Sequence, residues 1–235
     1  MKALLLAAGL GTRLRPLTDN NPKCLLDICG KPLLYIWLDK LENEDINEVI
    51  INTHFFPEKV NTAIQNRKNK IKVTILNEKN LLGTGGTIYS AKKYLQNEKD
   101  FFIIYADNLT NASLKNILRF HNSFDSVFTT YVYKTDKPKE KGIFLIDEQT
   151  GKVLEFEEKP QNPKSAIANA GIGILKNDIY NYLTDKIPLD FSKEIIPLLL
   201  NNMYVLKSDL PIFDIGTMKD YKNAQNYWQK LIYKK

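Results

Sequence analysis

The 235-residue sequence contains only two histidines and two cysteines. The spacing of Cys24 and Cys29 is not the C-x-x-C of a redox or zinc motif, and no second pair completes a disulfide framework. His54 and His121 are too few and too isolated for a metal centre or a catalytic triad, so we expect structural roles for both. These shortages exclude disulfide scaffolds and zinc-binding modules, and they predict two free thiols.

The sequence also lacks a long apolar run. Its first one, residues 3–8, is followed by glycine, is too short to cross a membrane and lacks the flanks of a secretory signal. With the free thiols, this predicts a cytoplasmic protein without a membrane partner. Lysines give a formal net charge of +6, but they are scattered along the chain. Such scatter favours a solvated surface over a nucleic-acid-binding one, although the net charge also fits a polyanionic partner such as a phosphorylated small molecule.

Arginine is scarce as well, with four residues against 29 lysines, yet two of the four lie in the stretch GLGTRLRPLT. An apolar run leads into Gly9-x-Gly11-Thr12-Arg13, and glycines there let backbone N–H groups approach phosphate oxygens. Arginine binds phosphate with two parallel hydrogen bonds, which lysine does not. The stretch matches neither the Walker loop nor the dinucleotide fingerprint. Taken alone, it also fits an ordinary glycine turn with surface arginines.

The pattern along the chain predicts an α/β fold. Short apolar runs alternate with helical patterns, which favours a mostly parallel sheet covered by helices on both faces. In the first half we expect strands at 3–7, 48–52, 73–76, 101–105 and 127–133, and helices at 33–41, 57–65, 86–95 and 114–121. In the second half we expect strands at 143–146, 153–156 and 171–175, and helices at 177–183, 192–200 and from Gly216 to the end. The second half should add antiparallel strands to the same sheet.

Further polar and glycine-rich motifs follow predicted strands, where α/β sheets bind ligands. The glycine cluster at residues 82–87 offers backbone groups to a flat ring, and it also fits a tight turn before a helix. Asp107 and Asp214 each follow apolar residues and are suitable ligands for Mg²⁺, although each also fits a helix cap or a turn. Glu158 with Lys159 suits a sugar phosphate, and it also fits a charged hairpin end.

Together these motifs resemble the sugar-1-phosphate nucleotidylyltransferase family over nearly the whole chain. LLLAAGLGTRLRPLT with NPKCLL resembles the family's signature loop, and LLGTGGTI its base-binding loop. FEEKP, ANAGIGIL, DFSKEIIPLLL and DIGT resemble its sugar-phosphate and closing segments. The family often has glycine where this chain has Ala106. The resemblance implies a Rossmann-like three-layer sandwich of the GT-A-like nucleotidyltransferase type, in one domain over residues 1–235, with a nucleotide-binding half to about residue 135 and a sugar-phosphate-binding half from about residue 136.

The resemblance also implies a role for each matching residue. It assigns catalysis to Arg13 and Lys23; nucleotide binding to Ala7, Ala8, Gly9, Gly11, Thr12, Glu78, Gly83 and Gly86; sugar-phosphate binding to Glu158, Lys159, Asn169 and Gly171; and Mg²⁺ to Asp107 and Asp214. Arg15 lies one step outside the motif and is left without a catalytic role. Relatives are often dimers or tetramers, so the resemblance also allows a homo-oligomer.

The implied reaction joins a nucleoside triphosphate to a sugar 1-phosphate and releases pyrophosphate, for cell-surface polysaccharide biosynthesis. LLGTGG with Glu78 upstream looks closer to guanylyl- and uridylyl-transferring relatives, which favours GTP with a hexose or heptose 1-phosphate. UTP or CTP, and a non-sugar phosphate acceptor, remain alternatives. A glycosyltransferase of similar architecture is less favoured, because the sequence contains no Asp-x-Asp.

Overall fold

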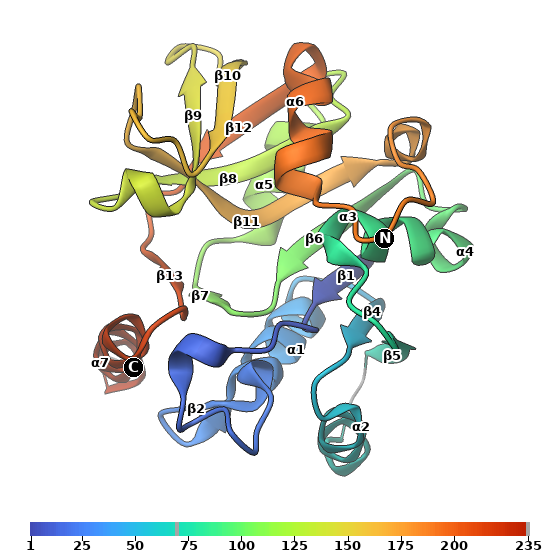
Figure 1. The fold of residues 1–235 in the computed structure, drawn as a ribbon, viewed down its shortest axis with the longest axis vertical. Helices are drawn as coiled ribbons and strands as arrows, with labels where there is room; N and C mark the ends of the chain where they lie inside the picture. The colour runs from blue at the N-terminus through green and yellow to red at the C-terminus, as the bar shows by residue number, and fades with distance from the viewer. Residues whose placement is uncertain (69–70, 234–235) are drawn as a thin grey trace.

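Strand β1, Lys2–Leu6, lies inside a nine-stranded sheet in the computed structural model, which describes residues 1–68 and 71–233 (Figure 1). Its side chains are buried on both faces: Ala3 and Leu5 belong to one apolar cluster, and Leu4 to a second one. Burial on both faces is what a continuous apolar run predicts.

The order in which strands are added to the sheet changes direction at β1, because the next strands lie on one side of it and β6 lies on the other. The strands parallel to it are β4 (Glu48–Thr53), β5 (Lys72–Asn77) and β6 (Asp100–Tyr105), in the order β6-β1-β4-β5. Since β4 lies on one side of β1 and β6 on the other, the loops that follow β1 and β6 separate at the carboxyl edge of the sheet. Such a switch point is where open α/β sheets bind ligands.

The second half of the chain extends this sheet, as predicted. Its strands are β9 (Gly142–Ile146), β10 (Val153–Glu158), β11 (Ile167–Lys176) and β12 (Met203–Lys207). They join β8 (Phe128–Lys134), the last strand predicted in the first half. The long β11 runs antiparallel to β6, β8 and β9, β10 runs antiparallel to β9, and β12 runs parallel to β8. The β12 strand was not predicted, because its residues directly follow a helical pattern.

Helices cover both faces of the sheet, which confirms the predicted three-layer sandwich. One layer contains α1 (Leu33–Asn43), α2 (Pro57–Asn66) and α5 (Leu114–His121), and α7 (Met218–Tyr233) joins the same apolar cluster from beside the sheet (Figure 1). The opposite layer contains α3 (Gly83–Ser90), α4 (Lys92–Leu95) and α6 (Ile196–Leu199). Among the described residues, no helix is long and apolar enough to span a bilayer.

Several predicted helices differ from the observed ones. The helix expected at 86–95 begins earlier, at Gly83, because the first-turn N–H groups of Gly85 and Gly86 find an acceptor in the Leu189 carbonyl oxygen. It is interrupted at Ala91 and resumes as α4. The segment expected at 192–200 is a π-helix, Phe191–Ile195, that continues into α6 and a 3₁₀ turn, Leu200–Asn202. The segment expected at 177–183 is a 3₁₀ helix, Asn177–Asn181. The predicted C-terminal helix includes residues 234–235, which lie outside the described residues.

Short elements border the sheet and were not predicted. Two small pairs of antiparallel strands are β2 (Asp27–Ile28) with β3 (Lys31–Pro32), and β7 (Asn108–Thr110) with β13 (Ile212–Asp214). Three further 3₁₀ helices cover Thr12–Leu14, Lys23–Leu25 and Pro138–Glu140. The β7–β13 pair matters most for function, because it joins the strand end after β6 to the segment before α7.

Candidate active site

The loop after β1, residues 7–13, carries Arg13 at the switch point. Gly11 has a left-handed backbone with φ +65°, which glycine adopts without steric cost, and its carbonyl oxygen accepts a 2.8 Å hydrogen bond from the Thr18 hydroxyl. A Cβ placed on Gly9 would meet no atom within 4 Å. In the described part of the chain, the N–H groups of Gly9 and Leu10 have no protein acceptor. The loop therefore presents backbone donors with room for an anion.

Glu78 is buried, with 5% of its surface exposed, and it connects both loops predicted to bind nucleotide. Its carboxylate accepts hydrogen bonds from Asn52 Nδ2 at 2.9 Å, the Thr87 hydroxyl at 2.6 Å and the Leu82 N–H at 3.3 Å. Asn52 Oδ1 in turn accepts the Ala7 N–H at 2.6 Å. Glu78 thus braces the loop after β1 and the start of α3, while its direct contact with a nucleotide stays a prediction.

The glycines at the start of α3 have a packing role that the sequence did not reveal. Gly83 has φ +74°, and a Cβ there would collide with the Leu189 backbone. A Cβ on Gly85 would lie 2.8 Å from Leu189 Cγ. Gly86 donates its N–H to the Leu189 carbonyl oxygen at 3.3 Å. The close approach of the Leu189 segment thus accounts for glycine here, and binding of a base by Gly83 and Gly86 stays a prediction.

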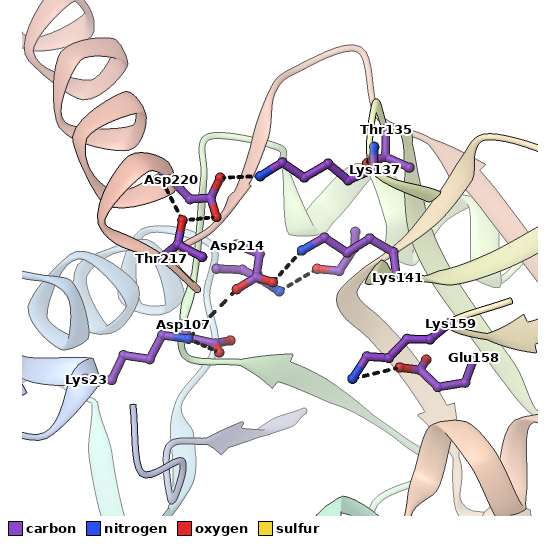
Figure 2. Close-up of polar contacts among 12 residues, drawn as sticks. Lys23, Asp107, Thr135, Lys137, Lys141, Glu158, Lys159, Asp214, Thr217 and Asp220 are labelled. Atoms are coloured by element: carbon purple, nitrogen blue, oxygen red, sulfur yellow. Dashed lines mark hydrogen bonds and ion pairs between the residues drawn. The ribbon is translucent and has the colours of Figure 1, made fainter. Parts of the chain in front are cut away.

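The side chains of Lys23, Asp107 and Asp214 lie close together at the carboxyl edge of the sheet, near the switch point (Figure 2). Lys23 Nζ lies 2.6 Å from Asp107 Oδ2 and 3.8 Å from Asp214 Oδ1. The β7–β13 pairing brings the two aspartates together, and the Ile215 N–H reinforces it by donating to the Asp107 carbonyl oxygen at 3.0 Å. One ammonium therefore bridges the two carboxylates that were predicted to bind metal.

Lys141 is a site residue that sequence reasoning missed. Its ammonium lies 2.5 Å from Asp214 Oδ2, on the opposite carboxylate oxygen from Lys23 (Figure 2). Burial lowers the pKa of Lys141, but the charge of Asp214 and the hydrogen bond to it outweigh that effect and raise the pKa above its usual value. A lysine before a glycine at the start of β9 belongs to no recognised motif, so no signal in the sequence identified it.

A second unpredicted pair lies beside Lys141. Lys137 Nζ lies 3.1 Å from Asp220 Oδ1, and Asp220 Oδ2 accepts a 2.7 Å hydrogen bond from the Thr217 hydroxyl at the start of α7 (Figure 2). Burial raises the pKa of Asp220, but the hydrogen bonds from Thr217 and Lys137 outweigh it and hold the pKa below its usual value. This pair ties the first turn of α7 to the segment before β9.

The residues predicted to bind the sugar phosphate line the other side of the site. Burial raises the pKa of Glu158, whose carboxylate lies 3.9 Å from Lys159 Nζ. Lys159 has φ +54°, an uncommon conformation for a residue with a side chain. Asn169 Oδ1 accepts hydrogen bonds from the Gly171 N–H at 3.0 Å and the Thr130 hydroxyl at 3.1 Å. Asn169 therefore shapes the bend of β11 as well as lining the site.

A cavity of about 240 Å³ lies between several of these groups. Its lining includes the predicted residues Arg13, Asp107, Glu158, Lys159, Asn169, Gly171 and Asp214, and also Lys141, Glu140 and Asp220. The remaining predicted residues are not among its lining residues: Lys23, Ala7, Ala8, Gly9, Gly11, Thr12, Glu78, Gly83 and Gly86. The structure therefore divides the predicted residues among this cavity, the loop after β1, Lys23 beside Asp107, and the region of α3. Five carboxylates and three cationic side chains face the cavity, which gives it an acidic lining.

The two aspartates fit a site for one divalent cation. Mg²⁺ is usually held by one or two carboxylates together with substrate phosphates and water. Asp107 and Asp214 supply two carboxylates that already converge on one positive charge, the ammonium of Lys23. Among the described residues, no group of three or more His, Cys, Asp or Glu side chains forms a self-sufficient metal cage. The donor set therefore suits a divalent cation whose other ligands are water molecules or phosphate oxygens.

Comparison with known proteins identifies the class that this fold and site define. The nucleotidyl transferase family model matches residues 2–230. The chain belongs to the nucleotidyl transferase family. This match confirms the resemblance that the sequence motifs carried.

Two individual proteins are similar to this chain over nearly all of its length. Mannose-1-phosphate guanylyltransferase 1 of Arabidopsis thaliana is 33% identical over 227 residues, which covers 94% of this chain and 63% of that protein. The chain thus spans less than two thirds of the length of this curated relative. A crystal structure of HddC from Yersinia pseudotuberculosis complexed with GMP-PN is 28% identical with a TM-score of 0.81, and the match covers 97% of this chain and 99% of that one.

A third comparison concerns the fold alone. A putative glucose-1-phosphate thymidylyltransferase structure from Bacillus anthracis is 21% identical, with a TM-score of 0.86 over 97% of this chain and 94% of that one. The high structural agreement at low identity shows that the three-layer architecture is shared.

Proposed function

We propose that the chain is a nucleotidylyltransferase that joins GTP to a hexose 1-phosphate and releases pyrophosphate. The observation that carries this proposal is the convergence of Arg13, Lys23, Asp107 and Asp214 at the switch point, beside the Glu158–Lys159 end of β10. Cations for phosphates, carboxylates for a metal and polar groups for a sugar thus lie together. No Ser, Cys or His nucleophile is needed for such a transfer.

The proposed chemistry is a single displacement. An oxygen of the sugar 1-phosphate attacks the α-phosphorus of the triphosphate, and the bond from that phosphorus to the bridging oxygen of pyrophosphate breaks. Arg13 and the exposed N–H groups of the loop after β1 would hold the triphosphate, and Lys159 would hold the sugar phosphate. Most of the rate would come from positioning and from charge stabilisation, as in other phosphoryl-type transfers.

We propose Mg²⁺ as the cofactor, held by Asp107 and Asp214. Support comes from the acidic lining of the cavity, because carboxylates without a divalent cation would repel two polyanionic substrates. When bound, Mg²⁺ would neutralise phosphate charge and polarise the α-phosphate. Lys23, which now bridges the two aspartates, would then be available to the triphosphate.

The choice of GTP and hexose is supported by the relatives. The Arabidopsis thaliana protein is named a mannose-1-phosphate guanylyltransferase, and the Yersinia pseudotuberculosis structure contains GMP-PN. A heptose 1-phosphate is the alternative sugar, and UTP or CTP the alternative nucleotides. The nucleotide sugar would serve as a donor for cell-surface polysaccharide. The free thiols of Cys24 and Cys29 favour a reducing cytoplasm as its location.

The proposal is tested by pairing each common nucleoside triphosphate with a panel of sugar 1-phosphates and measuring pyrophosphate release. We expect release with GTP and a hexose 1-phosphate, and none when EDTA removes the divalent cation. Release with UTP or CTP alone would replace the nucleotide assignment. Absence of release from every pair, with a folded protein and excess Mg²⁺, would contradict the enzymatic function.

A further inference from the structure

Four charged side chains alternate in sign across the site (Figure 2). Lys141 contacts Asp214 Oδ2 at 2.5 Å, Lys23 lies 3.8 Å from Asp214 Oδ1, and Lys23 contacts Asp107 Oδ2 at 2.6 Å. Both carboxylates proposed to hold the metal therefore already carry a lysine ammonium. A divalent cation that binds them must displace these ammonium groups or accept their repulsion.

The ammonium of Lys141 is suited to such a displacement. Asp214 is its one ion-pair partner in the described part of the chain, and a cation bound to that carboxylate would stand within a few ångströms of Lys141 Nζ. At that separation the repulsion between two positive charges exceeds thermal energy even at a protein surface. Lysine carries a compact charge on a flexible four-carbon chain, so the ammonium moves without moving the backbone.

The backbone of Lys141 is fixed to the sugar-phosphate side of the cavity. Its carbonyl oxygen accepts the Lys159 N–H at 3.0 Å, and the adjacent Gly142 pairs with Glu158 in the β9–β10 ladder. Lys141 also lines the same cavity as Glu158, Lys159 and Gly171. An ammonium released from Asp214 therefore remains beside the position proposed for the sugar 1-phosphate.

We propose that Lys141 is a displaceable counter-ion that links metal binding to sugar-phosphate binding. Before substrates bind, its ammonium neutralises Asp214. When a divalent cation binds Asp107 and Asp214, the ammonium moves onto the phosphate of the sugar 1-phosphate. The metal and the sugar phosphate then increase each other's affinity, since such coupling is reciprocal. This inference rests on the proposed function for its substrate, but its counter-ion step concerns the protein and the metal alone.

The counter-ion step is tested without substrates, by titrating the protein with Mn²⁺ and following the free ion by electron paramagnetic resonance. We expect Lys141→Met to bind Mn²⁺ at least about fivefold more tightly than the wild type, because a competing charge is removed. Lys137→Met is the matched control, since Lys137 pairs with Asp220 instead, and its affinity should stay within about twofold of the wild type. Equal or weaker binding by Lys141→Met, including no detectable binding by either protein, would overturn the proposal.

The transfer step is tested by steady-state kinetics at saturating Mg²⁺. We expect Lys141→Met to raise the KM for the sugar 1-phosphate about tenfold, the loss typical of one charged hydrogen bond, with the KM for the nucleotide nearly unchanged. Lys141→Arg should restore part of the affinity. A rise confined to the nucleotide KM, or a fall in kcat with both KM values unchanged, would overturn the transfer.

Two further controls keep the outcomes distinct. If thermal melting shows Lys141→Met to be unfolded, Lys141→Gln replaces it in both experiments. If no pair of substrates reacts with the wild type, the proposed function and the transfer step fail together, while the Mn²⁺ comparison still decides whether Lys141 is the counter-ion.

Discussion

Arg13 differs from the other cations of the site in having no carboxylate partner among the described residues, whereas Lys23, Lys141 and Lys159 each lie near one. Its guanidinium passes close to Gly216, where a Cβ would lie 3.2 Å from Arg13 Nη2. The side chain is exposed and lines the cavity. The planar guanidinium of Arg13 can therefore donate two parallel hydrogen bonds to the oxygens of one phosphate group.

Replacement of Arg13 is expected to affect turnover rather than folding. We predict that Arg13→Ala lowers kcat/KM roughly a hundredfold, as when one group that stabilises developing charge is lost. Arg15→Ala is the control, because Arg15 is exposed and its one ion-pair partner among the described residues is Asp19, at 3.3 Å. Both variants should melt at the wild-type temperature. Near-normal turnover by Arg13→Ala would remove Arg13 from the reaction.

His121 illustrates a titratable residue outside the site. It ends α5, is 4% exposed, and contacts the Thr129 hydroxyl at 2.8 Å and Asp100 Oδ1 at 3.4 Å. Burial lowers its pKa from the ordinary 6.5, although the charge of Asp100 opposes this shift. The histidine thus has the structural role that the sequence predicted for it.

The lowered pKa of His121 predicts acid sensitivity. As the pH falls below 6.5, the unfolded chain binds a proton at this position that the folded chain resists, so the free energy of unfolding decreases. In urea unfolding at pH 7.5 and 5.5, His121→Gln should lose less stability on acidification than the wild type. If both proteins lose the same amount, His121 makes no contribution to the pH dependence.

At the scale of elements, the start of α3 is fixed by the Leu189 segment. Leu189 donates its N–H to the Leu82 carbonyl oxygen at 2.9 Å and accepts the N–H groups of Gly85 and Gly86. The sequence shows only a glycine cluster, which suits a ligand loop and a packed helix start equally. The contact that distinguishes them joins residues far apart in the chain, so local patterns do not contain it.

The packing of α3 against Leu189 predicts different costs for two glycine substitutions. Gly83→Ala must accept φ +74° and a collision with the Leu189 backbone, and should destabilise the fold by about 2 to 4 kcal/mol. Gly30→Ala is the control, because Gly30 has φ +87° but open space around it, and should cost about 1 kcal/mol. Equal costs in urea unfolding would show that the contact with Leu189 is not what requires glycine.

Prediction from sequence succeeded for elements defined by their own residues. The runs that form β1, β4 and β6 were found because apolar strands buried on both faces are continuous in sequence. The short β7 and β13 were missed, since three residues carry no periodic signal and their stability comes from pairing with each other. Yet this pair places Asp214 beside Asp107.

In the whole molecule, the order and pairing of the strands determine which residues meet in the site. The switch at β1, the β7–β13 pair and the β9–β10 ladder bring together residues from both halves of the chain. The motifs identified Arg13, Lys23 and the two aspartates through resemblance to a family. Lys141 belongs to no motif, and its role follows only from its distance to Asp214.

Nucleotidyl transfer to a sugar 1-phosphate can be followed atom by atom with an isotope label. The protein is incubated with Mg²⁺, unlabelled GTP and a hexose 1-phosphate whose non-bridging phosphate oxygens are ¹⁸O, and the products are weighed by mass spectrometry. We expect every labelled oxygen in the nucleotide sugar and none in pyrophosphate, because the sugar phosphate attacks the α-phosphorus. Label in pyrophosphate, or no nucleotide sugar at all, would contradict it.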